Sequence, residues 1–191
     1  FAFSIWDKKE KTLFLARDRF GKKPLIYSSK NNTFSFASDI MSLKQLQDGG
    51  DVSKEAIKSL FRFRCIYEPL TIFENFRKLP PGSFLIYNRY GVKVSKYYDL
   101  SKKSQGALYN KDTVEKDITD LILKSVDKRL DVDVPLGVFL SGGIDSGLIL
   151  SALAKLEKKI PCFTIGFSDD NNYYNEIESA SFLAKHLGFK H

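Results

Sequence analysis

The most constraining feature of the sequence is an apolar run that stops at Ser-Gly-Gly and is followed at once by an apolar-periodic segment. The run ends at Leu140, the loop is Ser141-Gly142-Gly143, and Ile144-Asp145-Ser146 opens the periodic segment. Two adjacent glycines let a backbone turn tightly and approach a ligand closely. A helix that starts here would present unpaired amides and the positive end of its dipole to an anion. The pattern predicts a cradle for nucleotide phosphates.

Three polar side chains suggest which ligand this loop takes. Ser141 and Ser146 offer hydroxyl donors, and Asp145 offers a carboxylate. A carboxylate beside phosphates requires a divalent cation between them, and Mg²⁺ prefers such a mixture of carboxylate, phosphate and water oxygens. We therefore expect Mg-ATP, with Asp145 as the metal ligand. The sequence has no Walker loop, and the alternative is an ordinary strand-to-helix turn, in which these residue types are common.

The segments around the loop predict alternating helices and strands. Asp112-Thr-Val-Glu115 has the spacing of a capping box before an apolar-periodic helix that runs to Val126. A buried strand over 136–140, a helix over 144–156 and a strand over 162–167 are expected to follow. Strand, loop, helix and strand form the βαβ unit of a doubly wound parallel α/β sheet, whose ligands lie at the carboxyl ends of the strands.

The last segment predicts another amphipathic helix, with Asn175 as its N-cap and Gly188 as its C-terminal cap. His186 and His191 are expected at the surface near the helix end rather than as ligands. Two parallel strands cannot cover two helical layers by themselves, and the sequence starts at Phe1 in mid-strand by pattern. We therefore expect an internal fragment of a longer protein.

Composition narrows the class of protein. The chain has 191 residues, 43% of them hydrophobic, and a formal charge of +7. Lys and Arg are scattered among acidic residues, so we expect no nucleic-acid partner, and the charge suits an anionic substrate. No apolar run approaches the roughly twenty residues that span a bilayer, so no membrane partner is expected. Cys65 and Cys162 lack metal-ligand spacing, which favours a reduced, cytoplasmic setting with Cys162 buried.

The first part of the sequence predicts β-hairpins. Strand-like runs occur in two pairs separated by polar turns, 1–6 with 12–17 and 25–27 with 33–37. Ser38 is expected to cap a short helix after the second pair. Arg17-Asp18-Arg19, taken alone, is typical of a charge cluster at the surface.

Several literal strings resemble one family, the glutamine-hydrolysing asparagine synthetases. They follow the family's order over nearly the whole chain, at 16–27, 36–40, 71–83, 97–100, 133–146 and 163–167. The loop alone resembles the N-type ATP pyrophosphatases at large. The resemblance implies three parts: residues 1–48 as the β-rich end of a class II, N-terminal-nucleophile glutamine amidotransferase domain, 49–110 as an interdomain helix and β-hairpin region, and 111–191 as the start of the ATP-pyrophosphatase synthetase domain.

The family places its glutaminase nucleophile, a Cys, at the mature N-terminus. Neither Cys65 nor Cys162 fits that role, so the resemblance implies that this fragment lacks glutaminase activity. It also implies that Arg17-Asp18-Arg19 is a structural turn next to the glutaminase site. One departure from the family is Gly147, which stands where a second Ser is usual.

The implied reaction is ATP-dependent synthesis of asparagine from aspartate and glutamine. ATP would convert the aspartate side chain to β-aspartyl-AMP with release of pyrophosphate, and ammonia from glutamine would displace AMP. Ser141 and Asp145 are the expected catalytic residues, with Asp145 on Mg²⁺. The expected nucleotide-binding residues, of which Phe139 and Ile165 act through backbone groups on the adenosine part, are Phe139, Leu140, Ser141, Gly142, Gly143, Asp145, Ser146 and Ile165.

Several alternatives stay open at this point. A related amidotransferase could act on another carboxylate, such as that of a sugar, peptide or antibiotic precursor. Another ATP pyrophosphatase, such as a tRNA-modifying enzyme, would not carry the amidotransferase-like first half. The fragment by itself could be a non-catalytic nucleotide-binding chain. A homodimer is one assembly compatible with the resemblance.

Overall fold

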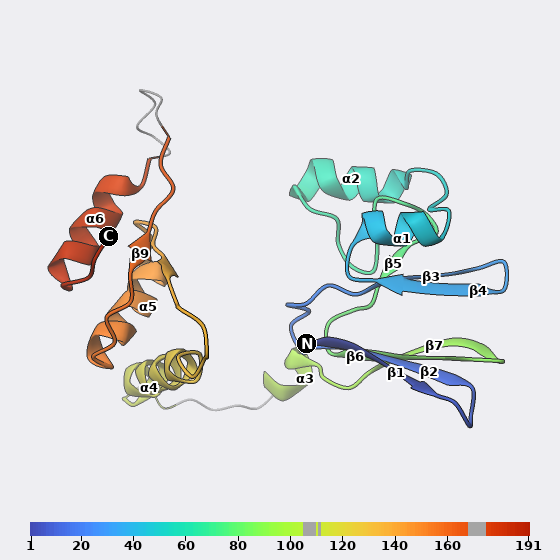
Figure 1. Ribbon diagram of the computed structural model, residues 1–191, viewed down its shortest axis with the longest axis horizontal. Coiled ribbons are helices and arrows are strands. Elements are labelled where there is room, and N and C mark those ends of the chain that lie inside the picture. Colours follow the sequence, from blue (N-terminus) through green and yellow to red (C-terminus); the bar gives the residue numbers. More distant parts are fainter. Residues whose placement is uncertain (105–109, 111, 168–174) are drawn as a thin grey trace. The chain divides into compact units, whose positions relative to one another are not determined.

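The computed structural model describes residues 1–104, 110, 112–167 and 175–191. The chain divides into two compact units, residues 1–107 and 108–191 (Figure 1). As a whole it is a mixed α/β protein with antiparallel sheets in the first unit and one parallel pair of strands in the second. Among the described residues, no helix is long and apolar enough to cross a membrane.

The first unit contains two antiparallel sheets (Figure 1). The larger has the strand order β1-β2-β6-β7, with β1 (Ala2–Asp7), β2 (Thr12–Arg17), β6 (Ser83–Asn88) and β7 (Gly91–Lys96). The smaller has the order β4-β3-β5, with β4 (Thr33–Ala37), β3 (Ile26–Lys30) and β5 (Arg77–Lys78). Both predicted hairpins are confirmed, because β1 pairs with β2 and β3 with β4.

The core of this unit lies between the two sheets. Leu15, Leu25, Leu79 and Leu85 are buried in one cluster, with side chains of β3 and β4 packed against it. Phe34 on β4 stacks on Tyr87 on β6, with ring centroids 4.5 Å apart. Burial of these side chains is the main force that holds the sheets together.

The helices of this unit, as far as it is described, are α1 (Ile40–Leu46), α2 (Lys54–Phe63) and α3 (Leu100–Ser104). The buried Leu43 packs α1 against Ile26 of β3 and against Phe76, which immediately precedes β5. The prediction that Ser38 caps this helix is wrong by one residue. Asp39 is the N-cap, because its carboxylate accepts a hydrogen bond from the Ser42 amide at 2.8 Å.

A buried arginine fixes the end of β2. Arg17 is 5% exposed, and its guanidinium donates hydrogen bonds to the backbone carbonyls of Gly21, Lys23 and Leu79 at 2.6–2.8 Å. It also forms an ion pair of 2.7 Å with the carboxylate of Glu68. For Arg17, therefore, the interpretation as a surface charge cluster is wrong.

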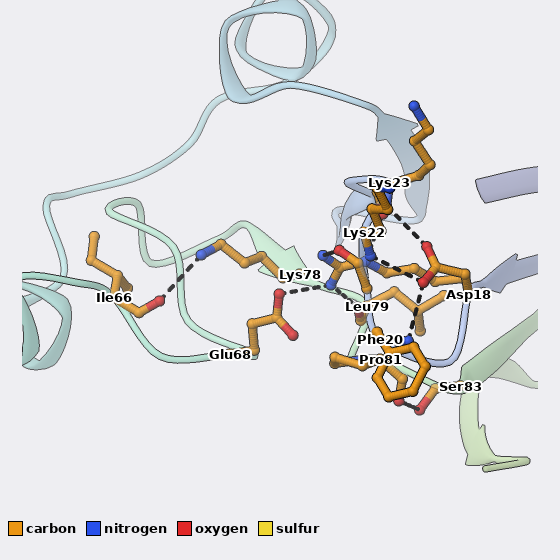
Figure 2. Close-up of polar contacts among 12 residues, drawn as sticks. Asp18, Phe20, Lys22, Lys23, Ile66, Glu68, Lys78, Leu79, Pro81 and Ser83 are labelled. Carbon is orange, nitrogen blue, oxygen red and sulfur yellow. Dashed lines mark hydrogen bonds and ion pairs between the residues drawn. The ribbon is translucent and has the colours of Figure 1, made fainter. Parts of the chain in front are cut away.

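The neighbouring Asp18 closes the turn from the other side. Figure 2 shows its carboxylate accepting hydrogen bonds from the backbone amides of Phe20, Lys22 and Lys23. Burial raises the pKa of Asp18, but these hydrogen bonds outweigh it and hold the pKa well below its ordinary value. The segment acts as a structural turn, as the resemblance implies.

The second unit is built around β8 (Val138–Phe139) and β9 (Cys162–Phe163), which pair in parallel. Its helices are α4 (Val114–Asp127), α5 (Ile144–Lys155) and α6 (Ile177–His186). The order β8, α5, β9 confirms the predicted βαβ unit. Both strands are shorter than predicted. The hydroxyl of Thr164 donates to the Leu140 carbonyl at 2.6 Å. This side-chain hydrogen bond links the two chain segments just beyond the last paired residues of β8 and β9.

The core of this unit is small and continuous. It consists of buried side chains from the residue after β8, from β9, α5 and α6, and from the chain after α6: Leu140, Leu150, Leu153, Cys162, Ala180, Ala184 and Phe189. The burial predicted for Cys162 is confirmed, and it raises the pKa of that thiol.

Two predicted caps in this unit need correction. The capping box of Asp112 and Glu115 is wrong, because Thr113 is the N-cap of α4 and the hydroxyl of Thr113 donates to Asp117 instead. Glu176, not Asn175, is the N-cap of α6, although the Asn175 side chain does accept from the Ile177 amide.

The predicted cap at Gly188 is confirmed. Its φ is +71°, a conformation that favours glycine. The Gly188 amide donates to the Lys185 carbonyl and the Phe189 amide to the Ala184 carbonyl, which is the Schellman pattern. The chain then turns back towards β9.

We predict that Arg17→Met lowers the free energy of unfolding of the first unit by about 3 kcal/mol or more, because it leaves the Glu68 carboxylate and three carbonyls without their donor. Arg19→Met is the matched control. Arg19 is exposed and lies over the Tyr98 ring at 5.3 Å, so its loss should cost about 1 kcal/mol or less. Denaturation followed by the fluorescence of Trp6, the single tryptophan, reports on this unit. Equal losses in the two variants would contradict the role of Arg17.

Candidate functional site

The predicted loop lies between the carboxyl end of β8 and the start of α5, as the sequence indicates. Gly143 is the N-cap of α5, with extended backbone angles. In the part of the chain that the structure describes, no side chain caps this helix. The first amides of α5 therefore remain available to an external anion at the positive end of the helix dipole.

The two serines of the loop contact one another. Ser141 Oγ lies 2.8 Å from Ser146 Oγ, and the Ser141 amide donates to Ser146 Oγ at 3.2 Å. The Ser146 hydroxyl is also 2.9 Å from the Ser141 carbonyl and 3.2 Å from that of Gly143. A hydroxyl has one proton, so Ser146 can donate to only one of these oxygens at a time. Ser146 is one of the expected phosphate donors, and here its hydroxyl links residues of the loop to one another.

Gly142 is set directly against α6. A Cβ atom at this position would lie 2.5 Å from the Cβ of Ser179, too close for any side chain. Gly166, after β9, also lies against α6, but its nearest neighbour is Cδ1 of Ile177, the end of a flexible side chain that can move away. The first turn of α6 thus contacts both loops that follow the strands, and steric overlap requires glycine at Gly142. No local pattern in the sequence indicates this contact with α6.

The remaining predicted residues divide between surface and core. Phe139 and Ile165, at the ends of adjacent strands, are 80% and 73% exposed. Asp145 is exposed in the first turn of α5. Leu140 is buried instead, and its amide donates to the Phe163 carbonyl at 2.8 Å while its own carbonyl accepts from Thr164.

Among the described residues, Asp145 belongs to no cluster of acidic side chains that would complete a metal cage. In the described ranges, no group of three or more His, Cys, Asp or Glu side chains could hold a metal ion. A single carboxylate fits Mg²⁺ when phosphate and water oxygens supply the other ligands, which is how this ion is commonly bound. The donor set therefore suits a metal that arrives with a nucleotide.

Sequence reasoning missed Thr164, Ser179, Ser181 and His191 as residues that shape the site. Ser179 lies against Gly142, and the other three are joined by hydrogen bonds that end at the Leu140 carbonyl. The one signal in the sequence was a Thr inside a short apolar run. Its partners are too far away in the sequence to be found from a local pattern.

Two family models match the chain in succession. A glutamine amidotransferase domain matches residues 1–98, and asparagine synthase matches residues 117–191. The first match covers the antiparallel sheets, and the second covers β8, α5, β9 and α6. This order defines an amidotransferase domain followed by a synthase domain.

Curated relatives agree with this order. The chain is 35% identical to asparagine synthetase [glutamine-hydrolyzing] 1 of Bacillus subtilis over 100% of its own length and 30% of that protein. It is 31% identical to putative asparagine synthetase [glutamine-hydrolyzing] 2 of Methanocaldococcus jannaschii, over 97% of the chain and 37% of that protein. It is 30% identical to amidase chry2 of Gibberella zeae, over 98% of the chain and 30% of that protein.

The chain belongs to the asparagine synthetase family. It spans about a third of the length of these relatives.

We predict that Gly142→Ala destabilises the second unit by about 1–3 kcal/mol, because the new methyl group overlaps the Cβ of Ser179. Gly147→Ala is the control. Its methyl group would meet only the mobile end of Leu183, and alanine favours the helix, so stability should stay equal or rise. Thermal unfolding of both variants checks this, with Ser179→Gly added to Gly142→Ala as a rescue. Failure of that rescue would contradict the steric explanation.

Proposed function

We propose that the full-length protein makes asparagine from aspartate, glutamine and ATP, by way of β-aspartyl-AMP and with release of AMP and pyrophosphate. The observation that carries the proposal is the Ser141–Ser146 loop, at the end of a parallel strand and the start of α5, inside the region that matches asparagine synthase. The amidotransferase match that precedes it supports glutamine as the nitrogen source.

The chemistry explains why such a loop is needed. A carboxylate is a poor electrophile, so transfer to AMP supplies it with a leaving group, and negative charge builds up on the departing pyrophosphate. In the proposal this charge is stabilised by hydroxyl and amide donors of Ser141, Gly142, Gly143 and Ser146. The positive end of α5 lies at the same place and adds to their effect.

Asp145 would hold Mg²⁺, which supplies charge neutralisation for the phosphates when it is bound. Its carboxylate is exposed in the first turn of α5 and is free of a metal cage of its own, as far as the described residues extend. Ser141 and Asp145 are thus the proposed catalytic residues.

The adenosine part would lie across the ends of the two parallel strands. Phe139 and Ile165 are exposed there, and their backbone groups are the proposed contacts. Leu140, the buried residue that precedes the loop, is the third proposed nucleotide-binding residue of this part. The ends of parallel strands are the usual ligand position in α/β sheets.

We further propose that β8 and β9 belong to a doubly wound sheet in the full-length protein. Support comes from the parallel pairing and from the Cys162 amide, which donates to the Lys190 carbonyl at 2.8 Å and so joins the chain after α6 to β9. The division into 1–48, 49–110 and 111–191 and the absence of glutaminase activity from this segment are part of the same proposal.

An amidotransferase that acts on another carboxylate is the second candidate. Its support is the similarity to a relative named amidase, because that relative is 30% identical to the chain and one synthetase relative is 31% identical to it. Aspartate dependence separates the two candidates, because a different acceptor would leave ATP cleavage indifferent to aspartate.

We predict that Asp145→Asn in the full-length protein lowers ATP-dependent pyrophosphate release by about a hundredfold, because the metal loses its carboxylate. Asp120→Asn, an exposed carboxylate on α4, is the matched control and should leave the rate unchanged. Release is measured with saturating Mg²⁺, alongside glutaminase activity and thermal unfolding, which neither change should affect. Unchanged pyrophosphate release in Asp145→Asn would sink the assignment.

A further inference from the structure

A chain of hydrogen-bonded side chains leads from α6 to the start of the phosphate loop. His191 lies in the middle, with Nδ1 2.8 Å from Ser181 Oγ on α6 and Nε2 2.7 Å from Thr164 Oγ1 after β9. Thr164 Oγ1 is in turn 2.6 Å from the carbonyl oxygen of Leu140. Leu140 immediately precedes Ser141.

The chemistry of these groups fixes the direction of each hydrogen bond. A carbonyl oxygen can only accept, so the Thr164 hydroxyl donates its single proton to Leu140. Thr164 Oγ1 can then only accept from the His191 ring, which places the imidazole proton on Nε2. The bare Nδ1 accepts from the Ser181 hydroxyl. A neutral His191 therefore has one tautomer that satisfies the whole chain.

These hydrogen bonds act on the peptide unit that joins Leu140 to Ser141. Its carbonyl is held by Thr164, and its amide is held by Ser146 at 3.2 Å. The orientation of this peptide decides the direction in which the loop leaves β8. The peptide is thus held on both sides, at its amide by Ser146 of the loop and at its carbonyl by Thr164, which is hydrogen-bonded to His191.

The backbone around His191 is also fixed. The Schellman turn at Gly188 ends α6, and the Cys162 amide of β9 donates to the Lys190 carbonyl at 2.8 Å. His191 is the next residue, so the pairing with β9 brings its ring beside Thr164.

We propose that His191 is a positioning residue of the phosphate loop and acts through Thr164 on the Leu140–Ser141 peptide. The inference rests on the proposed function, because it concerns the same loop and its donors. Displacement of a loop by a fraction of an ångström weakens donors aimed at a transition state more than it weakens the fold. Loss of His191 should therefore reduce turnover rather than stability.

The kinetic test uses the full-length protein. Thr164→Val removes the hydroxyl and keeps the shape, and His191→Ala removes the ring. Each should lower kcat for ATP-dependent pyrophosphate release about five- to tenfold, the size expected for one hydrogen bond. The double variant should be no worse than Thr164→Val alone, since both residues act in series.

Matched variants separate positioning from a general effect on the fold. His191→Gln keeps an N–H donor near Thr164 and should recover much of the lost kcat. His186→Ala removes the other histidine, which stacks on Phe182 of α6, and should leave kcat unchanged. Glutaminase activity and thermal unfolding should be the same in all variants.

A second readout needs no nucleotide. In the free protein, ¹⁵N NMR should find the neutral His191 ring protonated at Nε2, and amide exchange at Ser141 should be faster in His191→Ala and Thr164→Val than in wild type. A ring protonated at Nδ1, or exchange at Ser141 that neither variant alters, would overturn the inference.

The outcomes also separate this inference from the proposed function. A wild-type protein without ATP-dependent pyrophosphate release contradicts the proposed function, and the positioning role in that reaction is overturned with it. Normal release in wild type with equal kcat in His191→Ala and His186→Ala overturns the positioning role alone.

Discussion

The parallel pairing of β8 with β9 is the constraint on which the site depends. Parallel strands require a crossover, and here the crossover is α5, which begins directly after the loop. Parallel pairing also brings the carboxyl ends of both strands to one edge, where Phe139 ends β8 and Ile165 follows β9. Each strand has only two residues. The buried core and the Thr164 hydrogen bond must therefore supply much of the stability that a longer ladder of backbone hydrogen bonds would give to this pairing.

In both units, side chains satisfy backbone polar groups where the chain leaves a strand. A backbone that leaves a strand has polar groups without ladder partners, and buried ones must be satisfied by side chains. In the first unit, Arg17 serves carbonyls and Asp18 serves amides at the end of β2. In the second, Thr164 and Ser146 hold the two sides of one peptide at the end of β8. The first arrangement supports a sheet, whereas the second aims a loop at a proposed ligand.

Local patterns predicted the elements better than their ends. The hairpins, the βαβ order and the cap at Gly188 follow from periodicity and from glycine's freedom at positive φ, which are properties of neighbouring residues. The helix starts predicted at Ser38 and Asp112 are wrong by one residue, because a run of adjacent polar residues does not specify which of them is the N-cap. The burial of Arg17 depends on Glu68 and Leu79, far along the sequence. The link of Thr164 to Leu140 and His191 is equally non-local.

The proposed function requires that the full-length protein activates aspartate with ATP. The most direct measurement separates the products formed from ATP, glutamine and aspartate, with AMP and pyrophosphate resolved from ADP and phosphate. We expect AMP, pyrophosphate and asparagine in equal amounts, formed only when aspartate is present. ADP and phosphate, or AMP formation that does not depend on aspartate, would contradict it.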